Sequence, residues 1–468
     1  MILAVLSLGF FSVAYGIDPP EKMWDETYQD GGIFYDIEMT TDTCLILAAH
    51  HSHFFYAGAL QKVDMDGNMI WQAGEPTWWF HDARNVEVLP NGGFVAVGGC
   101  KIDENKTYQL FIMYVTAEGN VQWSHVYDDT TTVDVGYDVC PLPDGGYAMA
   151  GKGHGQAWIL RTDANGDTLW TDVWGTHTVN YAIGVEYDED NDWIAVLAYG
   201  RSDSLQVTSP HMLYYTLDGE YLFGTSYPEL PGRNPVDVCR AADDGYIFVS
   251  EYGEGFPSII SKTDDLGDLQ WFESLSHFGD GDACGIDRAV LDDGCMVTGF
   301  QADVWDAYGP ERAPGGAILI RFDGLGDEMW SILEGDSHYY QYRAALQLPQ
   351  GGYIAVGSKY GDGYLVRYAP ETGIEGPVGS AGGGLLRPVT PNPSSSVFHV
   401  SMDLPQAMDA RLEVFDTAGR RVGSLADGLL TVGEHEFTWD AAGLSSGCYL
   451  VRLSGAGVTE TRRCVLLR

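Results

Sequence analysis

Short apolar runs alternate with polar residues along most of the chain, and they return in the same order about every fifty residues. One unit reads YDVCPLPDGGYAMAG at residues 137–151 and AWILRTDANGDTLW at residues 157–170. Runs of this length, bounded by Gly, Asp and Asn, are typical of β-strands joined by tight turns. The pattern therefore predicts four strands in each unit.

Two turn signals mark every unit. The first signal is Asp-Gly-Gly in its full form and occurs seven times when partial copies are included. Five copies begin at Asn91, Asp144, Asp244, Asp293 and Gln350, and two degenerate copies begin at Thr41 and Asp190. The second contains a glycine and leads to an aromatic residue, and it occurs six times. Its glycines are Gly67, Gly119, Gly166, Gly219, Gly267 and Gly326, and its aromatic residues are Trp71, Trp123, Trp170, Phe223, Trp271 and Trp330. Glycine supplies the positive φ that such hairpins need.

The difference between seven and six copies predicts how the repeat closes. The last unit stops near residue 373, before its Trp strand, while Trp24 lies in an isolated Trp strand ahead of the first unit. We expect this N-terminal strand to complete the last unit and to leave no free edge. The recurrent Trp is expected to pack between units. Four strands in each of seven units predict an all-β fold with a seven-bladed β-propeller.

The chain changes character after the repeats. A Gly-rich linker is expected at 374–390. Alternating strand patterns in 391–468 predict a small Ig-like β-sandwich. At the other end, residues 1–16 have the length and small terminal residues of a signal peptide, cleaved before Ile17. The run lacks a preceding Lys or Arg, which leaves an atypical signal or an upstream start as alternatives. The propeller is then expected to span 17–373.

Charge excludes one class of partner. The formal net charge is −42, from 67 acidic and 25 basic residues, so nucleic acid would be repelled. No later stretch is apolar enough for a membrane span. The eight cysteines form no CxxC motif. Cys448 and Cys464 lie symmetrically about Ala456, which predicts that they face each other in a hairpin and raises the possibility of a disulfide.

Both parts of the chain resemble known families. The repeat resembles that of bacterial secreted propellers over residues 21–373. It is also similar to the repeat of quinoprotein dehydrogenases, although the adjacent cysteine pair of many of them is missing. The C-terminal blocks resemble the type A sorting domain of type IX secretion. Its motif residues would be Pro391, Asn392, Pro393, Asp416, Gly419, Arg420, Gly447, Tyr449, Arg462 and Arg463. This resemblance implies export by the type IX machinery, followed by release or attachment at the outer cell surface.

Candidate ligand-binding residues lie in the longer loops, on the face opposite the turns. They are Trp78, Trp79, His81, His177, His277, Trp305, Tyr308, His338 and Tyr339. Aromatic rings beside carboxylates suit a sugar, although the same rings could pack the loops onto the blades. Asp280, Asp282 and Asp306 are the candidates for general acid–base catalysis. The loop histidines could also converge on a metal.

Calcium is the one cation that the acidic turns suggest. Residues 64–68 and 163–167 resemble the start of a calcium loop, but Met69 and Thr168 stand where that loop needs glycine. We therefore expect hairpin turns and no cofactor, with calcium as the remaining candidate. The sequence favours a monomeric, non-catalytic surface propeller that binds a glycan or a protein. The alternative is a secreted polysaccharide hydrolase or lyase, and a purely structural component is a third.

Overall fold

The structure is a computed structural model of an all-β protein that divides into two compact units, residues 1–374 and 375–468. It describes residues 19–28, 32–51, 59–76, 78, 80–102, 107–127, 133–175, 180–201, 208–230, 234–251, 257–275, 281–291, 293–301, 304–305, 312–313, 315–324, 326–335, 339–371, 396–404, 408–416, 421–444, 447–455 and 458–466. Within these residues there is no helix that could cross a membrane. The predicted signal peptide and the linker lie outside them.

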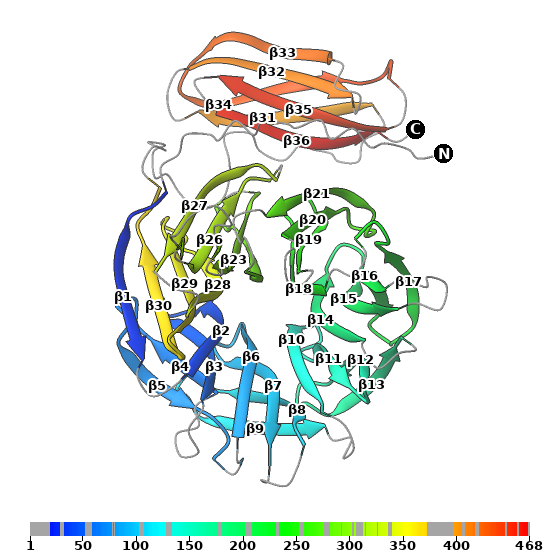
Figure 1. Ribbon diagram of the computed structural model, residues 1–468. Helices are drawn as coiled ribbons and strands as arrows, with labels where there is room; N and C mark the ends of the chain where they lie inside the picture. Colours follow the sequence, from blue (N-terminus) through cyan, green and yellow to red (C-terminus); the bar gives the residue numbers. More distant parts are fainter. Residues whose placement is uncertain are drawn as a thin grey trace. The chain divides into compact units, whose positions relative to one another are not determined.

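The first unit is a β-propeller whose four-stranded antiparallel blades follow one another around a ring (Figure 1). Its first three blades contain β2 (Gly32–Met39), β3 (Leu45–His51), β4 (Leu60–Val63) and β5 (Met69–Ala73); β6 (Phe80–Val88), β7 (Phe94–Lys101), β8 (Gln109–Val115) and β9 (Val121–Tyr127); and β10 (Val135–Pro141), β11 (Tyr147–Gly153), β12 (Gln156–Thr162) and β13 (Thr168–Trp174). The first two blades are joined into one sheet by a single pairing between β3 and β6.

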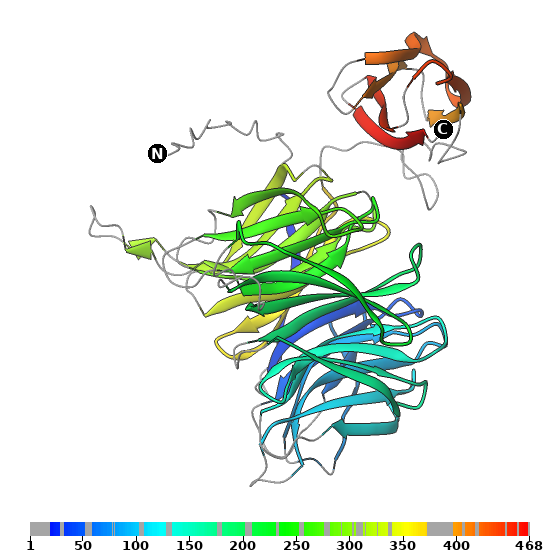
Figure 2. The ribbon, with the colours of Figure 1, turned by 90° about the vertical axis from the view of Figure 1, so that its right-hand side faces the viewer.

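Three further blades have the same order of strands, from the innermost to the outermost. They contain β14 (Tyr181–Asp188), β15 (Trp193–Arg201), β16 (Thr208–Thr216) and β17 (Tyr221–Ser226); β18 (Asn234–Arg240), β19 (Tyr246–Glu251), β20 (Ser258–Thr263) and β21 (Leu269–Leu275); and β22 (Ala283–Arg288), β23 (Cys295–Gln301), β26 (Gly316–Phe322) and β27 (Glu328–Glu334). Between β23 and β26 the chain forms a separate ribbon of β24 (Val304–Trp305) and β25 (Arg312–Ala313), seen at the edge of the propeller in Figure 2.

The last blade contains strands from both ends of the propeller. It consists of β28 (Tyr340–Gln347), β29 (Tyr353–Lys359), β30 (Asp362–Tyr368) and, on the outside, β1 (Lys22–Tyr28). In this pairing Trp24 lies opposite Arg367. The prediction that the Trp24 strand completes the last unit is therefore confirmed, and the outer edge of β30 is paired.

The recurrent Trp packs against the glycine of the next blade, as the sequence predicts. Gly119 has φ +86°, and a Cβ added there would lie 2.7 Å from Cδ2 of Trp71. The Trp71 indole also donates a 3.2 Å hydrogen bond to the carbonyl of Ala117 in the same turn. Equivalent contacts join Trp24 to Gly67, Trp123 to Gly166, Trp170 to Gly219 and Trp271 to Gly326. An indole filling the space left by a missing Cβ thus connects neighbouring blades.

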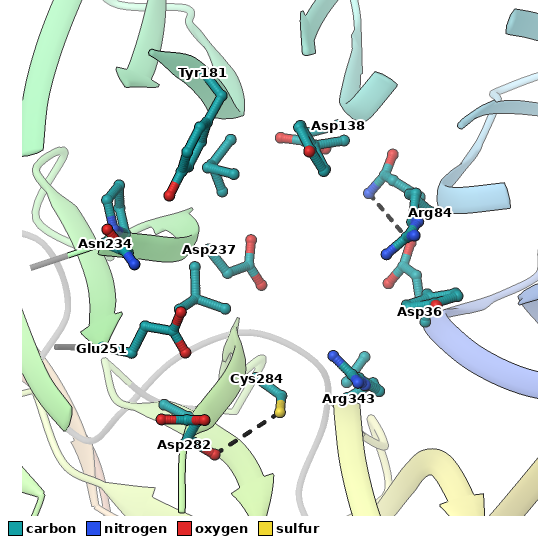
Figure 3. Close-up of a pocket in the computed structure, with 18 of the residues that line it drawn as sticks. Asp36, Arg84, Asp138, Tyr181, Asn234, Asp237, Glu251, Asp282, Cys284 and Arg343 are labelled. Carbon is teal, nitrogen blue, oxygen red and sulfur yellow. Dashed lines mark hydrogen bonds between the residues drawn. The ribbon is translucent and has the colours of Figure 1, made fainter. Parts of the chain in front are cut away.

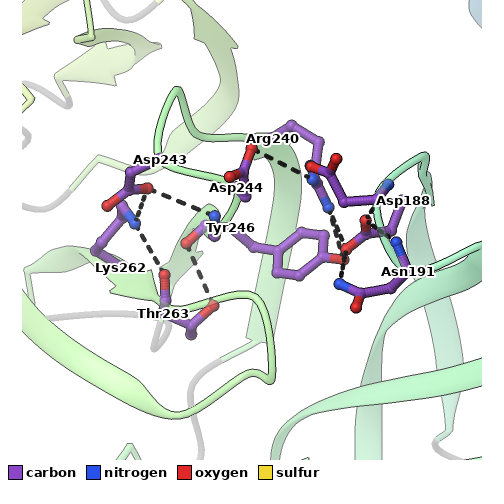
Figure 4. Close-up of polar contacts among 10 residues, drawn as sticks. Asp188, Asn191, Arg240, Asp243, Asp244, Tyr246, Lys262 and Thr263 are labelled. Carbon is purple, nitrogen blue, oxygen red and sulfur yellow. Dashed lines mark hydrogen bonds and ion pairs between the residues drawn. The ribbon is translucent and has the colours of Figure 1, made fainter. Parts of the chain in front are cut away.

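Cations on the turn face are paired with carboxylates, either of the preceding blade or of their own. The Arg240 guanidinium lies 2.6 Å from the carboxylate of Asp188 in the preceding blade, and the Tyr246 hydroxyl donates to the same carboxylate (Figure 4). Lys262 lies 2.6 Å from Asp243. These contacts satisfy groups that would be costly to bury alone.

The second unit contains two sheets around one apolar core. One sheet pairs β31 (Val397–Leu404) with β34 (Gly433–Asp440), and the other has the order β33 (Arg421–Leu430), β32 (Met408–Asp416), β35 (Gly447–Gly455) and β36 (Val458–Leu466). Phe398 and Trp439 stack in the core with ring centroids 5.2 Å apart.

The predicted pairing of the two C-terminal cysteines is wrong by one residue. Cys448 lies opposite Val465, and Cys464 lies opposite Tyr449. At the end of the hairpin Gly455 pairs with Val458, where a centre at Ala456 would pair Gly455 with residue 457. The geometry that suggested a disulfide between Cys448 and Cys464 is therefore not the register of this hairpin.

Candidate functional site

Every innermost strand of the propeller carries a β-bulge at the same place. In β2 the register with β3 shifts between Phe34 and Asp36, which leaves Tyr35 as the extra residue. Corresponding shifts occur in β6, β10, β14, β18, β22 and β28. Bulges redirect side chains and are common beside functional sites.

The bulged residues line a single pocket of about 550 Å³ at the centre of the ring. In blade order they are Tyr35, Arg84, Tyr137, Ile183, Val236, Cys284 and Arg343. The polar members are consecutive around the ring, from the last blade to the third, and the less polar members face them from the other three. The pocket lies near the beginning of the innermost strands, on the face of the longer loops.

The residue after the bulge often connects its blade to the next one. The Asp36 carboxylate accepts hydrogen bonds from the backbone amides of Ile37 and Val86, both at 2.8 Å. Asp138 likewise accepts from Val185 at 2.7 Å, and Asp237 accepts from Ile286 at 3.0 Å. Burial raises the pKa of Asp36 to about 6 and that of Asp138 to about 7. These aspartates hold the pocket wall together, and they are already occupied by the backbone.

One side of the pocket is cationic and aromatic. The Tyr35 ring lies between two guanidinium groups, with the Arg84 Cζ 4.1 Å and the Arg343 Cζ 5.5 Å from its centroid. Arg84 forms an ion pair with Asp82 at 2.7 Å. Arg343 donates to the Gln341 side chain at 3.1 Å.

The opposite side carries carboxylates and amides. Figure 3 shows Asn234, Glu251 and Asp282 across the pocket from Arg84 and Arg343. Burial raises the pKa of Glu251, and the negative charge of Asp282 raises it further. Burial also raises the pKa of Asp282. The pocket thus offers acceptors for hydroxyl groups on one side and donors for an anion on the other.

Only one of the three predicted catalytic candidates is placed in this pocket. Asp282 lines it, whereas Asp280 and Asp306 lie outside the described residues.

Of the predicted ligand-binding residues, Trp78 packs against Phe111 with centroids 5.0 Å apart, which fits the packing alternative. Tyr339 is 55% exposed and stacks on Tyr360. His81 lies on β6 and Trp305 on β24, with side chains that the structure does not describe. Trp79, His177, His277, Tyr308 and His338 lie outside the described residues altogether.

The acidic turns use their carboxylates internally. Asp64 accepts hydrogen bonds from the amides of Asp66 and Asn68, both at 2.9 Å. Asp163 accepts from Asn165 and Asp167 in the same way. These are the hydrogen bonds of an Asx turn. No group of three metal-ligating side chains is found in the described part of the chain.

The sorting-motif residues fall in the second unit. Tyr449 is buried in its core, next to Trp439 at a centroid distance of 5.3 Å. Asp416, Gly447, Arg462 and Arg463 lie on strands, with side chains outside the described part. Pro391, Asn392, Pro393, Gly419 and Arg420 lie outside the described residues.

Sequence reasoning missed most of the pocket. Arg84, Arg343, Tyr35, Tyr137 and Tyr181 were not among the candidates, which were sought in loops. The available signal was a residue followed by Asp or Asn, a few positions before the first turn signal, as in Tyr35-Asp36 and Tyr137-Asp138. Without knowledge of the bulge, this pattern is the same as that of an ordinary β-strand.

Comparison with known proteins identifies the C-terminal part. Residues 388–467 match the family described as "Secretion system C-terminal sorting domain". This match confirms the predicted type IX sorting domain, and the protein is therefore secreted and carried to the cell surface. A search of curated proteins gives no significant match.

Several solved structures are similar to this chain at low sequence identity. PorZ, a surface component of the type IX secretion system of Porphyromonas gingivalis, is 11% identical with a TM-score of 0.46, over 95% of this chain and 60% of that one. A Bacteroides caccae protein of unknown function is 12% identical with a TM-score of 0.39, over 65% and 94%. YCF48 bound to D1 peptide is 13% identical with a TM-score of 0.41, over 76% and 96%. The chain thus spans less than two thirds of the PorZ chain.

Proposed function

We propose that this secreted, surface-directed propeller is a non-catalytic binding protein whose ligand is a glycan held in the central pocket. The observation that carries the proposal is the convergence of all seven bulged residues on that one pocket. A bulge places a side chain out of the regular alternation of its strand. Seven bulges at one level bring seven side chains of different chemistry to one pocket.

The chemistry of the pocket suits a sugar. Tyr137 and Tyr181 lie with ring centroids 6.4 Å apart and supply flat apolar faces of the kind on which a pyranose ring stacks. Asn234, Glu251 and Asp282 supply hydrogen-bonding groups on the facing side. A mostly preformed cleft with a few polar groups is the usual form of a small-ligand site.

The proposal includes the remaining organisation of the chain. The seven four-stranded units are the complete set of blades, residues 1–16 are a signal peptide, and the mature propeller is a monomer. The sorting domain at 391–468 follows the linker at 374–390 and delivers the propeller to the surface. Once it is there, the pocket is available to glycans outside the cell.

A glycan array with residues 17–373 tests the binding function. We expect selective binding, and we expect Tyr181→Ala to weaken it by about 10- to 100-fold, because the variant removes an aromatic stacking surface. Tyr221→Ala is the matched control, since Tyr221 is 49% exposed on the outermost strand of the same blade. The absence of any glycan ligand, or equal binding by both variants, would contradict the proposal.

A second candidate function is a polysaccharide hydrolase or lyase. It is favoured by Glu251 and Asp282, two carboxylates on one wall whose pKa values are both raised by burial. Incubation with polysaccharide panels would release reducing or unsaturated ends if this function is correct. The activity should then fall by about 100-fold or more in Glu251→Gln and in Asp282→Asn. Intact polysaccharides with the unmodified protein would exclude it.

A further inference from the structure

We infer that the central pocket selects an acidic sugar, and that the Arg343 guanidinium binds the carboxylate of that sugar. The inference rests on the proposed function and specifies its ligand class. It begins from the polar contacts of Arg343, which differ from those of Arg84, the other arginine of the pocket.

Arg343 is the arginine of the pocket that forms no ion pair in the described part of the chain, although its charge interacts with those of Glu251 and Asp282 across the pocket. Its polar contact there is the 3.1 Å hydrogen bond from Nη2 to the Gln341 side chain. Its Nε is buried and has no hydrogen-bond partner among the described residues. Arg84, by contrast, is paired with Asp82 at 2.7 Å, and Arg240 with Asp188 at 2.6 Å.

The chain carries 67 acidic and 25 basic residues. A guanidinium that is partly removed from water costs free energy unless an anion or acceptors compensate it. Carboxylates are so abundant in this chain that an arginine with a purely structural role could readily have been paired with one. A pocket guanidinium that forms no ion pair within the described residues therefore points to an anionic group that comes from outside the chain.

The bulge and Tyr35 hold Arg343 in a position to receive that group. Arg343 is the extra residue of β28, and its Cζ lies 5.5 Å from the Tyr35 centroid. Arg84 approaches the same ring from the neighbouring blade. Figure 3 shows Arg343 at the edge of the pocket, facing the side of Asp282 and Glu251. A guanidinium fixed in this way can donate two parallel hydrogen bonds to one carboxylate.

The opposite wall limits how much negative charge the ligand carries. Glu251 and Asp282 would repel a second anionic group, while they can accept hydrogen bonds from sugar hydroxyls. Ile183 and Val236 add an apolar section suited to the C–H face of a ring. One carboxylate with several hydroxyls on a saturated ring that has an apolar C–H face is the chemistry of a uronic acid.

Isothermal titration calorimetry with the full chain tests this inference. The probes are oligogalacturonates and oligoglucuronates, and neutral galactose and glucose oligomers of equal length. We expect the unmodified protein to prefer a uronate over its neutral counterpart by about 10- to 100-fold, the usual value of a charge-assisted hydrogen bond. Arg343→Gln should abolish that preference, Arg343→Lys should retain part of it, and added salt should weaken it.

Controls separate this inference from the proposed function. Arg288→Gln removes an exposed arginine from the neighbouring innermost strand and should leave binding unchanged. If neutral and acidic sugars bind the unmodified protein equally, or if Arg343→Gln keeps the preference, the inference fails while glycan binding stands. A preference for sulfated or phosphorylated sugars over uronates would also overturn it. If no sugar binds, the proposed function fails as well.

Thermal unfolding of Arg343→Gln shows whether the change acts through stability. Because the variant removes a partly unsatisfied cation, we expect its Tm to stay within a few degrees of the unmodified protein. If Arg343→Gln fails to fold, the salt dependence of uronate binding and the Arg343→Lys variant decide the question. Uronate binding that is insensitive to both salt and Lys would contradict the inference.

Discussion

At the scale of single residues, the contact between a tryptophan and a glycine of the next blade accounts for the strongest feature of the repeat. The glycines of these turns have φ between +79° and +89°. In five of the six turns an added Cβ would meet an indole, and at Gly267 it would meet the Tyr214 hydroxyl at 2.5 Å. Glycine is therefore required for two reasons: the backbone has a positive φ, and the aromatic side chain of the adjacent blade occupies the place of a Cβ.

Replacing Gly119 by alanine separates these two requirements. We expect Gly119→Ala to destabilise the propeller by about 2–4 kcal/mol, because it strains a positive φ and displaces the Trp71 indole. Gly155 is the matched control, since its φ is +75° and nothing lies within 4 Å of an added Cβ. Gly155→Ala should cost about 1 kcal/mol. Chemical denaturation measures both, and equal losses would refute the packing role.

At the scale of elements, the position of β1 decides whether the propeller is closed. Its seven residues supply the outer strand of the last blade. Asp25 on this strand accepts a hydrogen bond from the Tyr364 hydroxyl, which lies 339 positions later in the sequence. Trp24 also covers Gly67 of the first blade, and the Tyr28 hydroxyl donates to the Gly67 carbonyl at 2.6 Å. This strand therefore contacts both the last blade and the first.

Deleting residues 17–28 should open the ring. We expect a markedly lower Tm and a tendency to aggregate, because the edge of β30 becomes unpaired. Deleting residues 17–20 removes no residue of β1 and serves as the control. Calorimetry and light scattering measure the outcome. An unchanged Tm and a monomeric product after the longer deletion would show that the last blade does not need its outer strand.

At the scale of the whole molecule, acidic residues of several innermost strands lie close enough to raise one another's pKa values. Burial raises the pKa of Glu38 and of Glu186 to about 8 and that of Asp138 to about 7. Carboxylates in unfolded chains have pKa values near 4. The folded protein thus binds protons more tightly than the unfolded chain between about pH 4 and pH 8.

The propeller should therefore be more stable at mildly acidic pH than at pH 8. A raised carboxyl pKa contributes stability that is present at low pH and is lost as pH rises toward the folded value. We expect the Tm to rise by several degrees from pH 8 to pH 5. Glu186→Gln should reduce this slope, whereas Glu189→Gln, an exposed neighbour, should not. A Tm that falls over this range would contradict the expectation.

Sequence patterns predicted only the part of the site that comes from a loop. Asp282 was identified from a loop motif, and it does line the pocket. Arg84 and Arg343 come from strands, and a strand pattern indicates alternating faces without showing an extra residue. Their placement depends on register shifts between Ala83 and Asn85 and between Tyr342 and Ala344. No local rule in the sequence specifies those shifts.

The sequence by itself determined the repeat, the turns, the placement of the Trp24 strand and the sorting domain. Each depends on local chemistry: glycine at positive φ, an indole of fixed size, or a motif read in order. Only the tertiary structure decided the pocket and the C-terminal register, in which Cys448 pairs with Val465. These features arise where strands distant in sequence meet, and a shift of one residue there changes every contact without changing the local pattern.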